Sequence, residues 1–119
     1  MELYDKKGKP IAYIENEEDI YTFTGKPVAY INDNKIFGFN GSHLGWFENG
    51  WIRDLNGECV LFSSTAQGGP IKPIEQISPI KSIQKIKPIK AIKEIPKIKS
   101  IFSSSWSNLS GEGFLSKGI

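Results

Sequence analysis

The sequence contains little of the chemistry from which active sites and metal centres are usually built. Its 119 residues include one histidine, His43, and one cysteine, Cys59. A lone cysteine cannot form an internal disulfide, which favours a reducing compartment. No Walker loop, Gly-x-Ser-x-Gly or His-Glu-x-x-His motif is present. We therefore expect a protein that is not an enzyme and needs no cofactor or metal.

Long apolar runs are also missing. No stretch approaches the roughly 18 consecutive apolar residues of a membrane-spanning helix, and the start, MELYDKKGKP, lacks the pattern of a signal peptide. Both absences predict a cytoplasmic protein without a transmembrane segment.

Charge is unevenly distributed behind a small net value of +2. Residues 1–70 hold six Lys and Arg against ten Asp and Glu, whereas residues 71–101 hold eight Lys against two Glu. We call residues 1–70 the acidic front and residues 71–101 the basic rear. Their opposite charges predict that the rear docks on the front, within one chain or between chains.

What the sequence does contain is a fourfold repeat over residues 3–64. Each copy is centred on a glycine, with an aliphatic residue three positions later and an aromatic residue five positions later. The glycines are Gly8, Gly25, Gly41 and Gly57, the aliphatic residues are Ile11, Val28, Leu44 and Val60, and the aromatic residues are Tyr13, Tyr30, Trp46 and Phe62. The residue five positions before each glycine is Leu3, Ile20, Ile36 or Ile52.

Each copy has the pattern of a β-hairpin. Its flanks alternate apolar β-formers, and Asn40-Gly41 and Asn56-Gly57 predict two-residue turns in which both residues have positive φ. Pro10 and Pro27 follow their turns, as expected for the start of a strand. Four such units predict about eight short strands, and closing them into a ring would remove the exposed edges.

On these residues the chain resembles the small bacterial four-fold β-flower proteins. The resemblance implies four hairpins around a pseudo-four-fold axis, an all-β fold, and no activity that could be transferred to particular residues. WG-type and YD-type β-repeat proteins are competing resemblances, although their arrays usually contain more copies.

A second pattern begins after the linker, residues 65–70. Isoleucine occupies every third position from 71 to 101, eleven times in succession. A period of three fits neither an α-helix nor a β-strand, but it places all eleven side chains on one edge of a polyproline II helix. Four prolines within this Ile/Lys/Pro ladder also oppose a helix.

At about 3.1 Å per residue, the extended ladder would be about 95 Å long, against a diameter of roughly 25–30 Å for the hairpin domain. The ladder could be disordered, could wrap around its own domain, or could pair with ladders of other subunits. We favour pairing in a homo-oligomer, because disordered tails are poor in β-branched aliphatics. The predicted interface comprises Ile74, Ile77, Ile80, Ile83, Ile86, Ile89, Ile92, Ile95 and Ile98.

The last segment, residues 102–119, is rich in Ser and Gly with spaced aromatics. It predicts either a short helical turn near Asn108 or a final hairpin, and its large apolar residues indicate capping contacts.

The leading functional hypothesis is a structural or interaction protein. Its four hairpins form a domain over residues 1–64, and it self-associates through the ladder, residues 71–101. The alternative is a module that binds nucleic acid or polysaccharide with an exposed aromatic column, Tyr13, Tyr30, Trp46 and Phe62. Nucleic acid is not favoured as a partner, because the front is acidic. A catalytic pair of His43 and Cys59, which share one repeat position, ranks last.

Overall fold

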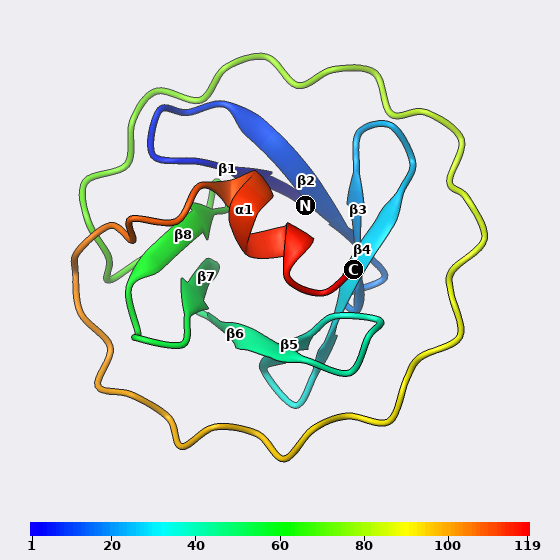
Figure 1. Cartoon of the computed structure of the whole chain (residues 1–119). Coiled ribbons are helices and arrows are strands. Elements are labelled where there is room, and N and C mark those ends of the chain that lie inside the picture. The colour runs from blue at the N-terminus through cyan, green and yellow to red at the C-terminus, as the bar shows by residue number, and fades with distance from the viewer.

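The computed structural model covers all 119 residues and shows a closed, eight-stranded antiparallel barrel encircled by its own chain (Figure 1). Consecutive strands pair with one another, and the last pairs with the first. The elements are β1 (Glu2–Tyr4), β2 (Pro10–Glu15), β3 (Asp19–Thr22), β4 (Pro27–Asn32), β5 (Lys35–Phe37), β6 (His43–Glu48), β7 (Trp51–Asp54), β8 (Cys59–Phe62) and α1 (Gly111–Ser116). The predicted all-β fold of four hairpins is confirmed.

The four repeat glycines lie in the turns of the hairpins β1–β2, β3–β4, β5–β6 and β7–β8. Their φ angles are between +81° and +90°, which L side chains avoid. Only the glycine of each turn has positive φ, so the prediction of two-residue turns at Asn40-Gly41 and Asn56-Gly57 is wrong. The turns are three-residue loops, braced for example by Asp54, whose Oδ1 accepts hydrogen bonds from the amides of Asn56 and Glu58.

The turns with two positive φ angles join one hairpin to the next. Asn16-Glu17, Asp33-Asn34 and Asn49-Gly50 all have φ between 52° and 82°. Asn, Asp and Gly tolerate this conformation best, and it suits the right-handed twist of the flanking strands.

Each hairpin carries a β-bulge at the same place. In the first, Leu3 pairs with Ala12 and Tyr4 with Pro10, which leaves Ile11 as the extra residue. Val28, Leu44 and Val60 are the extra residues of the other three hairpins. The aliphatic position of the repeat is therefore the bulge, and all four side chains join the central core.

The core fills the barrel with aliphatic side chains at matching positions. Its members from the first strand of each hairpin are Leu3, Ile20, Ile36 and Ile52, all fully buried. Strands β6 and β7 approach closely at Gly45, where an added Cβ would meet the backbone carbonyl oxygen of Arg53 on the neighbouring strand.

Helix α1 covers one end of the barrel (Figure 1). Ser110 caps it by accepting a hydrogen bond from the Gly113 amide, and Phe114 and Leu115 are buried in the central core. Of the two structures predicted for the C-terminal segment, the helix is therefore the one that forms, beginning at Gly111. The capping contacts that its apolar residues indicated are confirmed.

Residues 71–101, here called the belt, form no helix or strand and run around the outside of the barrel (Figure 1). Of the three possibilities for the ladder, wrapping of its own domain is the one observed, whereas pairing with other subunits stays a prediction. The perimeter of the domain, and not its diameter, determines the length of chain that wrapping requires. A disc 36–37 Å across has a perimeter of about 115 Å, and about 95 Å of extended chain fits most of the way around it.

Candidate interaction surface

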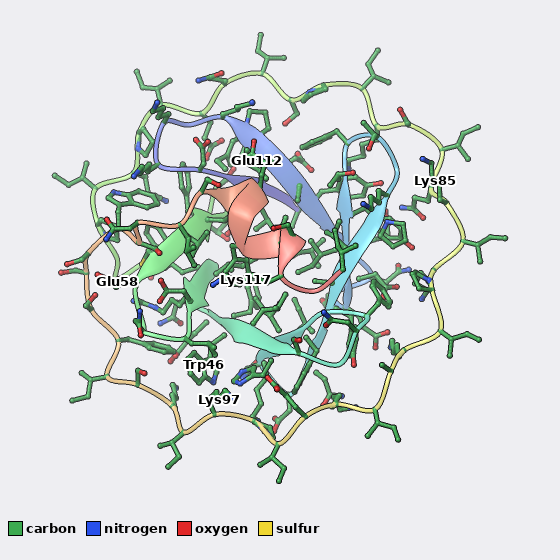
Figure 2. The ribbon with its side chains drawn as sticks, viewed as in Figure 1. Trp46, Glu58, Lys85, Lys97, Glu112 and Lys117 are labelled. Carbon is green, nitrogen blue, oxygen red and sulfur yellow. The ribbon has the colours of Figure 1, made fainter.

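The outer edge of the molecule is lined with isoleucine. All eleven isoleucines of the belt, here called the isoleucine rim, are between 88% and 97% exposed. Figure 2 shows a regular row of belt side chains projecting outward from the disc, while Trp46 and Lys97 lie on the inner side of the belt. Monomeric proteins rarely expose so much apolar side chain without a binding purpose.

The belt and the residues just after it are hydrogen-bonded to the hairpin turns at intervals of nine residues. The amides of Gln76, Lys85, Glu94 and Ser103 donate to the carbonyl oxygens of Gly8, Gly25, Gly41 and Gly57, respectively, at 2.9–3.2 Å. A Cβ on any of these glycines would lie 2.0–2.6 Å from the carbonyl oxygen of Ile74, Ile83, Ile92 or Ile101. Glycine is therefore required at each turn both by its positive φ and by the close approach of the belt.

The same nine-residue repeat is present in the sequence, where the three-residue period of isoleucine obscures it. Residues 70–105 divide into PIKPIEQIS, PIKSIQKIK, PIKAIKEIP and KIKSIFSSS, one nonapeptide for each hairpin. Its third position is always lysine: Lys72, Lys81, Lys90 and Lys99.

These lysines hold the belt to the barrel. Lys81 lies 4.4 Å from the ring centre of Tyr13 and 3.4 Å from a carboxylate oxygen of Glu2. Lys90 lies in the same way over Tyr30, at 4.2 Å. Other ion pairs join Lys87 to Asp19, Lys90 to Glu18 and Lys99 to Glu48. The predicted docking of the basic rear on the acidic front is confirmed, and it occurs within one chain.

The aromatic column lies beneath this layer. Tyr13, Tyr30, Trp46 and Phe62 are at most 4% exposed. The expectation that these four side chains form an exposed aromatic face is wrong, because the belt and the C-terminal segment cover them.

Comparison with protein families agrees with this architecture. The model of a family described as "4-fold beta flower protein" matches residues 1–115. The chain belongs to the 4-fold beta flower family. The match includes the belt and most of α1 as well as the repeat, so the resemblance drawn from residues 3–64 extends over nearly the whole chain. Searches of curated proteins and of solved structures found no match.

The two reactive side chains of this beta flower protein are not paired with each other. His43 is 2% exposed, its Nε2 bonds to the carbonyl oxygen of Gly45, and its Nδ1 accepts a hydrogen bond from the amide of Lys97. Cys59 is fully buried beside Trp106, and burial raises the pKa of its thiol. His43 therefore fastens the belt, and Cys59 belongs to a packed cluster.

This role of His43 predicts that acid weakens the fold. Burial lowers the pKa of His43, and an imidazolium could not accept the Lys97 amide hydrogen. Because the folded-state pKa is depressed, its contribution to stability is complete above the unfolded value of about 6.5 and is lost as pH falls through the folded value, by at most about 1.4 kcal/mol per pH unit. Urea unfolding between pH 7.5 and 5.5 measures this loss. His43→Asn, which keeps an acceptor but does not titrate, is expected to flatten the dependence, and equal slopes in both proteins would contradict the assignment.

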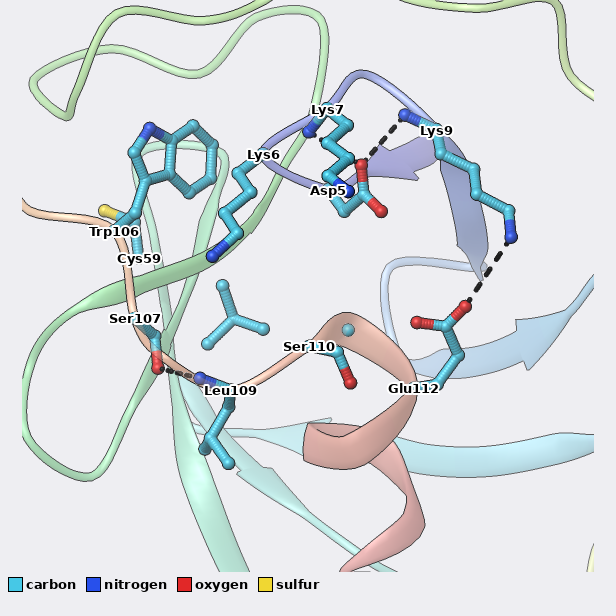
Figure 3. Close-up of a pocket in the computed structure, with 12 residues that line it drawn as sticks. Asp5, Lys6, Lys7, Lys9, Cys59, Trp106, Ser107, Leu109, Ser110 and Glu112 are labelled. Carbon is cyan, nitrogen blue, oxygen red and sulfur yellow. Dashed lines mark hydrogen bonds and ion pairs between the residues drawn. The ribbon is translucent and has the colours of Figure 1, made fainter.

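The beta flower also has a cavity of about 310 Å³ between its first hairpin turn and the C-terminal segment (Figure 3). Lys6 reaches into it, and an exposed ion pair of 3.8 Å between Lys9 and Glu112 lies at its edge. The carboxylate of Asp5 is already bonded to the amides of Lys7 and Lys9. The cavity is thus lined by the ammonium groups of Lys6, Lys7 and Lys9, of which Lys9 forms an ion pair.

A second cavity, of about 540 Å³, lies at the turns that join the hairpins. Ile14, Ile31 and Phe47 are its apolar residues along with Met1, and Glu15, Glu17, Asn16 and Asn34 are its polar ones. No cluster of three or more His, Cys, Asp or Glu side chains has a geometry suited to a metal ion. No helix of this protein is long and apolar enough to cross a membrane.

Proposed function

We propose that this beta flower protein is a non-enzymatic structural or interaction protein that associates with further copies of itself through the isoleucine rim. The observation that carries the proposal is the near-complete exposure of all eleven rim isoleucines. Burial of one isoleucine side chain stabilises a complex by about 1.5–3 kcal/mol before the costs of association are subtracted.

The construction of the belt supports this proposal. Its backbone and its lysines are bonded to the barrel, so the isoleucines are held outward on a rigid support. A preorganised surface loses little conformational entropy on binding, which favours association.

The test is a triple substitution, Ile83→Ser, Ile86→Ser and Ile89→Ser. These side chains are 93–96% exposed, so we expect the fold to be retained while self-association weakens at least tenfold. Light scattering over a range of protein concentrations measures the effect. Lys26→Ser and Lys85→Ser together are the matched control, since they change exposed residues that lie off the rim. Equal association of the wild type and the triple variant would disprove a role for the rim.

A further inference from the structure

We infer that copies of this protein meet edge to edge and form a single layer, in which the rim of one disc meshes with the rims of several neighbours. This inference rests on the proposed self-association and adds its geometry. Three observations carry it: the shape of the rim, its constant spacing, and the unpaired backbone behind it.

The convex shape of the rim limits each contact. Adjacent rim isoleucines are about 9 Å apart along the belt, so roughly three from each disc can meet where two discs touch. At about 60–120 Å² of apolar surface for each isoleucine, the value implied by its transfer energy, one contact buries about 360–720 Å². A stable pairwise interface needs about 1,200 Å² or more. A single edge contact is therefore weak, and the rim is covered only when a disc has several neighbours.

The spacing of the rim favours a second copy over an unrelated partner. All eleven isoleucines keep the interval of three residues without exception. The interval of three keeps every isoleucine on the outer edge of the extended belt, and no other apolar residue replaces isoleucine at any of the eleven positions. An identical copy presents the same interval, so the side chains of one rim can lie in the gaps of the other along the whole contact.

The fourfold construction gives the layer a natural arrangement. Each nonapeptide of the belt spans one quarter of the disc, and the first three quarters each carry three isoleucines. Neighbouring discs that bind at different quarters of the rim would therefore each contact nearly the same arrangement of isoleucines. Where two discs with the same face upward touch, their two belts run antiparallel to each other.

A lipid bilayer fits the rim poorly. The belt contains many more amides than the hydrogen bonds it makes to the hairpins, and the remaining amides depend on water. Immersion in hydrocarbon would leave them unpaired at a cost of several kcal/mol each. Edge contact between discs buries only the isoleucine side chains and leaves this backbone hydrated.

The experiment compares the wild type with two variants by sedimentation velocity and electron microscopy of stained samples. The first variant exchanges neighbouring residues, Ile77→Ser with Ser78→Ile and Lys85→Ile with Ile86→Lys, which keeps composition and charge but breaks the spacing. The second replaces every rim isoleucine except Ile80, Ile83 and Ile86 with serine, which leaves one intact quarter.

We expect wild-type assemblies to grow beyond dimers with concentration, as sheets about 22 Å thick, the smallest dimension of the disc. The exchange variant is expected to reduce assembly at least tenfold, and the one-quarter variant to stop at a weak dimer. Circular dichroism and thermal unfolding establish that both variants are folded.

The alternatives give different results. A wild-type dimer that does not grow, or an exchange variant that assembles like the wild type, would overturn the layer while leaving the proposed self-association standing. A wild type that is monomeric at every concentration would overturn both. Binding to phosphatidylcholine vesicles without self-assembly would also overturn both and identify a lipid surface as the partner.

Discussion

Gly41→Ala is expected to lower the free energy of unfolding by about 2–4 kcal/mol and to loosen the belt from the third hairpin. The φ of Gly41 is +90°, and an L residue in the left-handed region costs about 1–2 kcal/mol. The added Cβ would also lie within 2.3 Å of the carbonyl oxygen of Ile92. The belt must then move outward and lose the hydrogen bond from the Glu94 amide to Gly41, worth about 0.5–1.5 kcal/mol.

Two measurements check this expectation. Urea unfolding gives the loss of stability, and limited trypsin digestion reports faster cleavage after Lys90, Lys93 and Lys97 once the belt is displaced. Gly68→Ala is the matched control, because Gly68 has a φ of +79° but no atom within 4 Å of its added Cβ. Equal losses for the two substitutions would show that the belt contact contributes nothing.

Phe114→Ala is expected to cost about 3–5 kcal/mol, because Phe114 is fully buried where α1 closes the barrel. Small domains are stable by about 5–15 kcal/mol in all, so this one substitution removes a large part of the total. Phe114→Leu, which keeps most of the volume, is expected to cost less.

Chemical denaturation of these variants beside Ser116→Ala tests the role of the helix. Ser116 is exposed on the same helix and donates only to the Gly113 carbonyl oxygen, so its replacement separates helix propensity from core packing. A loss below about 1 kcal/mol for Phe114→Ala would mean that the core does not depend on α1.

The barrel was largely predictable because each position of the repeat has a physical role. Leu3 and its three equivalents had to be apolar to fill the barrel, and Gly8 and its equivalents had to be glycine to adopt positive φ. The turn type was not predictable in the same way. An Asn-Gly pair suits a two-residue turn, but the bulge at Leu44 changes the pairing and places only Gly41 in the left-handed region.

The belt shows why the rest was harder to predict. A three-residue period defines one edge of an extended chain but does not say whether that edge faces the barrel or the solvent. The direction depends on the hydrogen bonds of the belt backbone to the hairpin turns, which no side-chain pattern encodes directly. The nonapeptide, with Lys81 and Lys90 nine residues apart, would have matched the belt to the four hairpins and indicated wrapping.

The burial of the aromatic column was not predictable for the same reason. Tyr13 and Tyr30 point away from the barrel core, which in an isolated barrel would expose them. Their burial depends on Lys81 and Lys90 of the belt, more than 50 residues later in the sequence. Because the belt covers these aromatic side chains, the candidate interaction surface is the isoleucine rim outside them.

The order in which the belt meets the hairpins has a consequence for biosynthesis. The chain circles the same axis twice, and the belt reaches Gly8, Gly25, Gly41 and Gly57 in the order in which the ribosome makes them. Each hairpin turn that binds the belt has therefore been synthesised before the belt residues that bind it leave the ribosome. The belt can bind the four hairpins one after another, and α1 covers the end of the barrel last. Contacts distant in sequence usually slow folding, but vectorial synthesis lets this chain form them one after another.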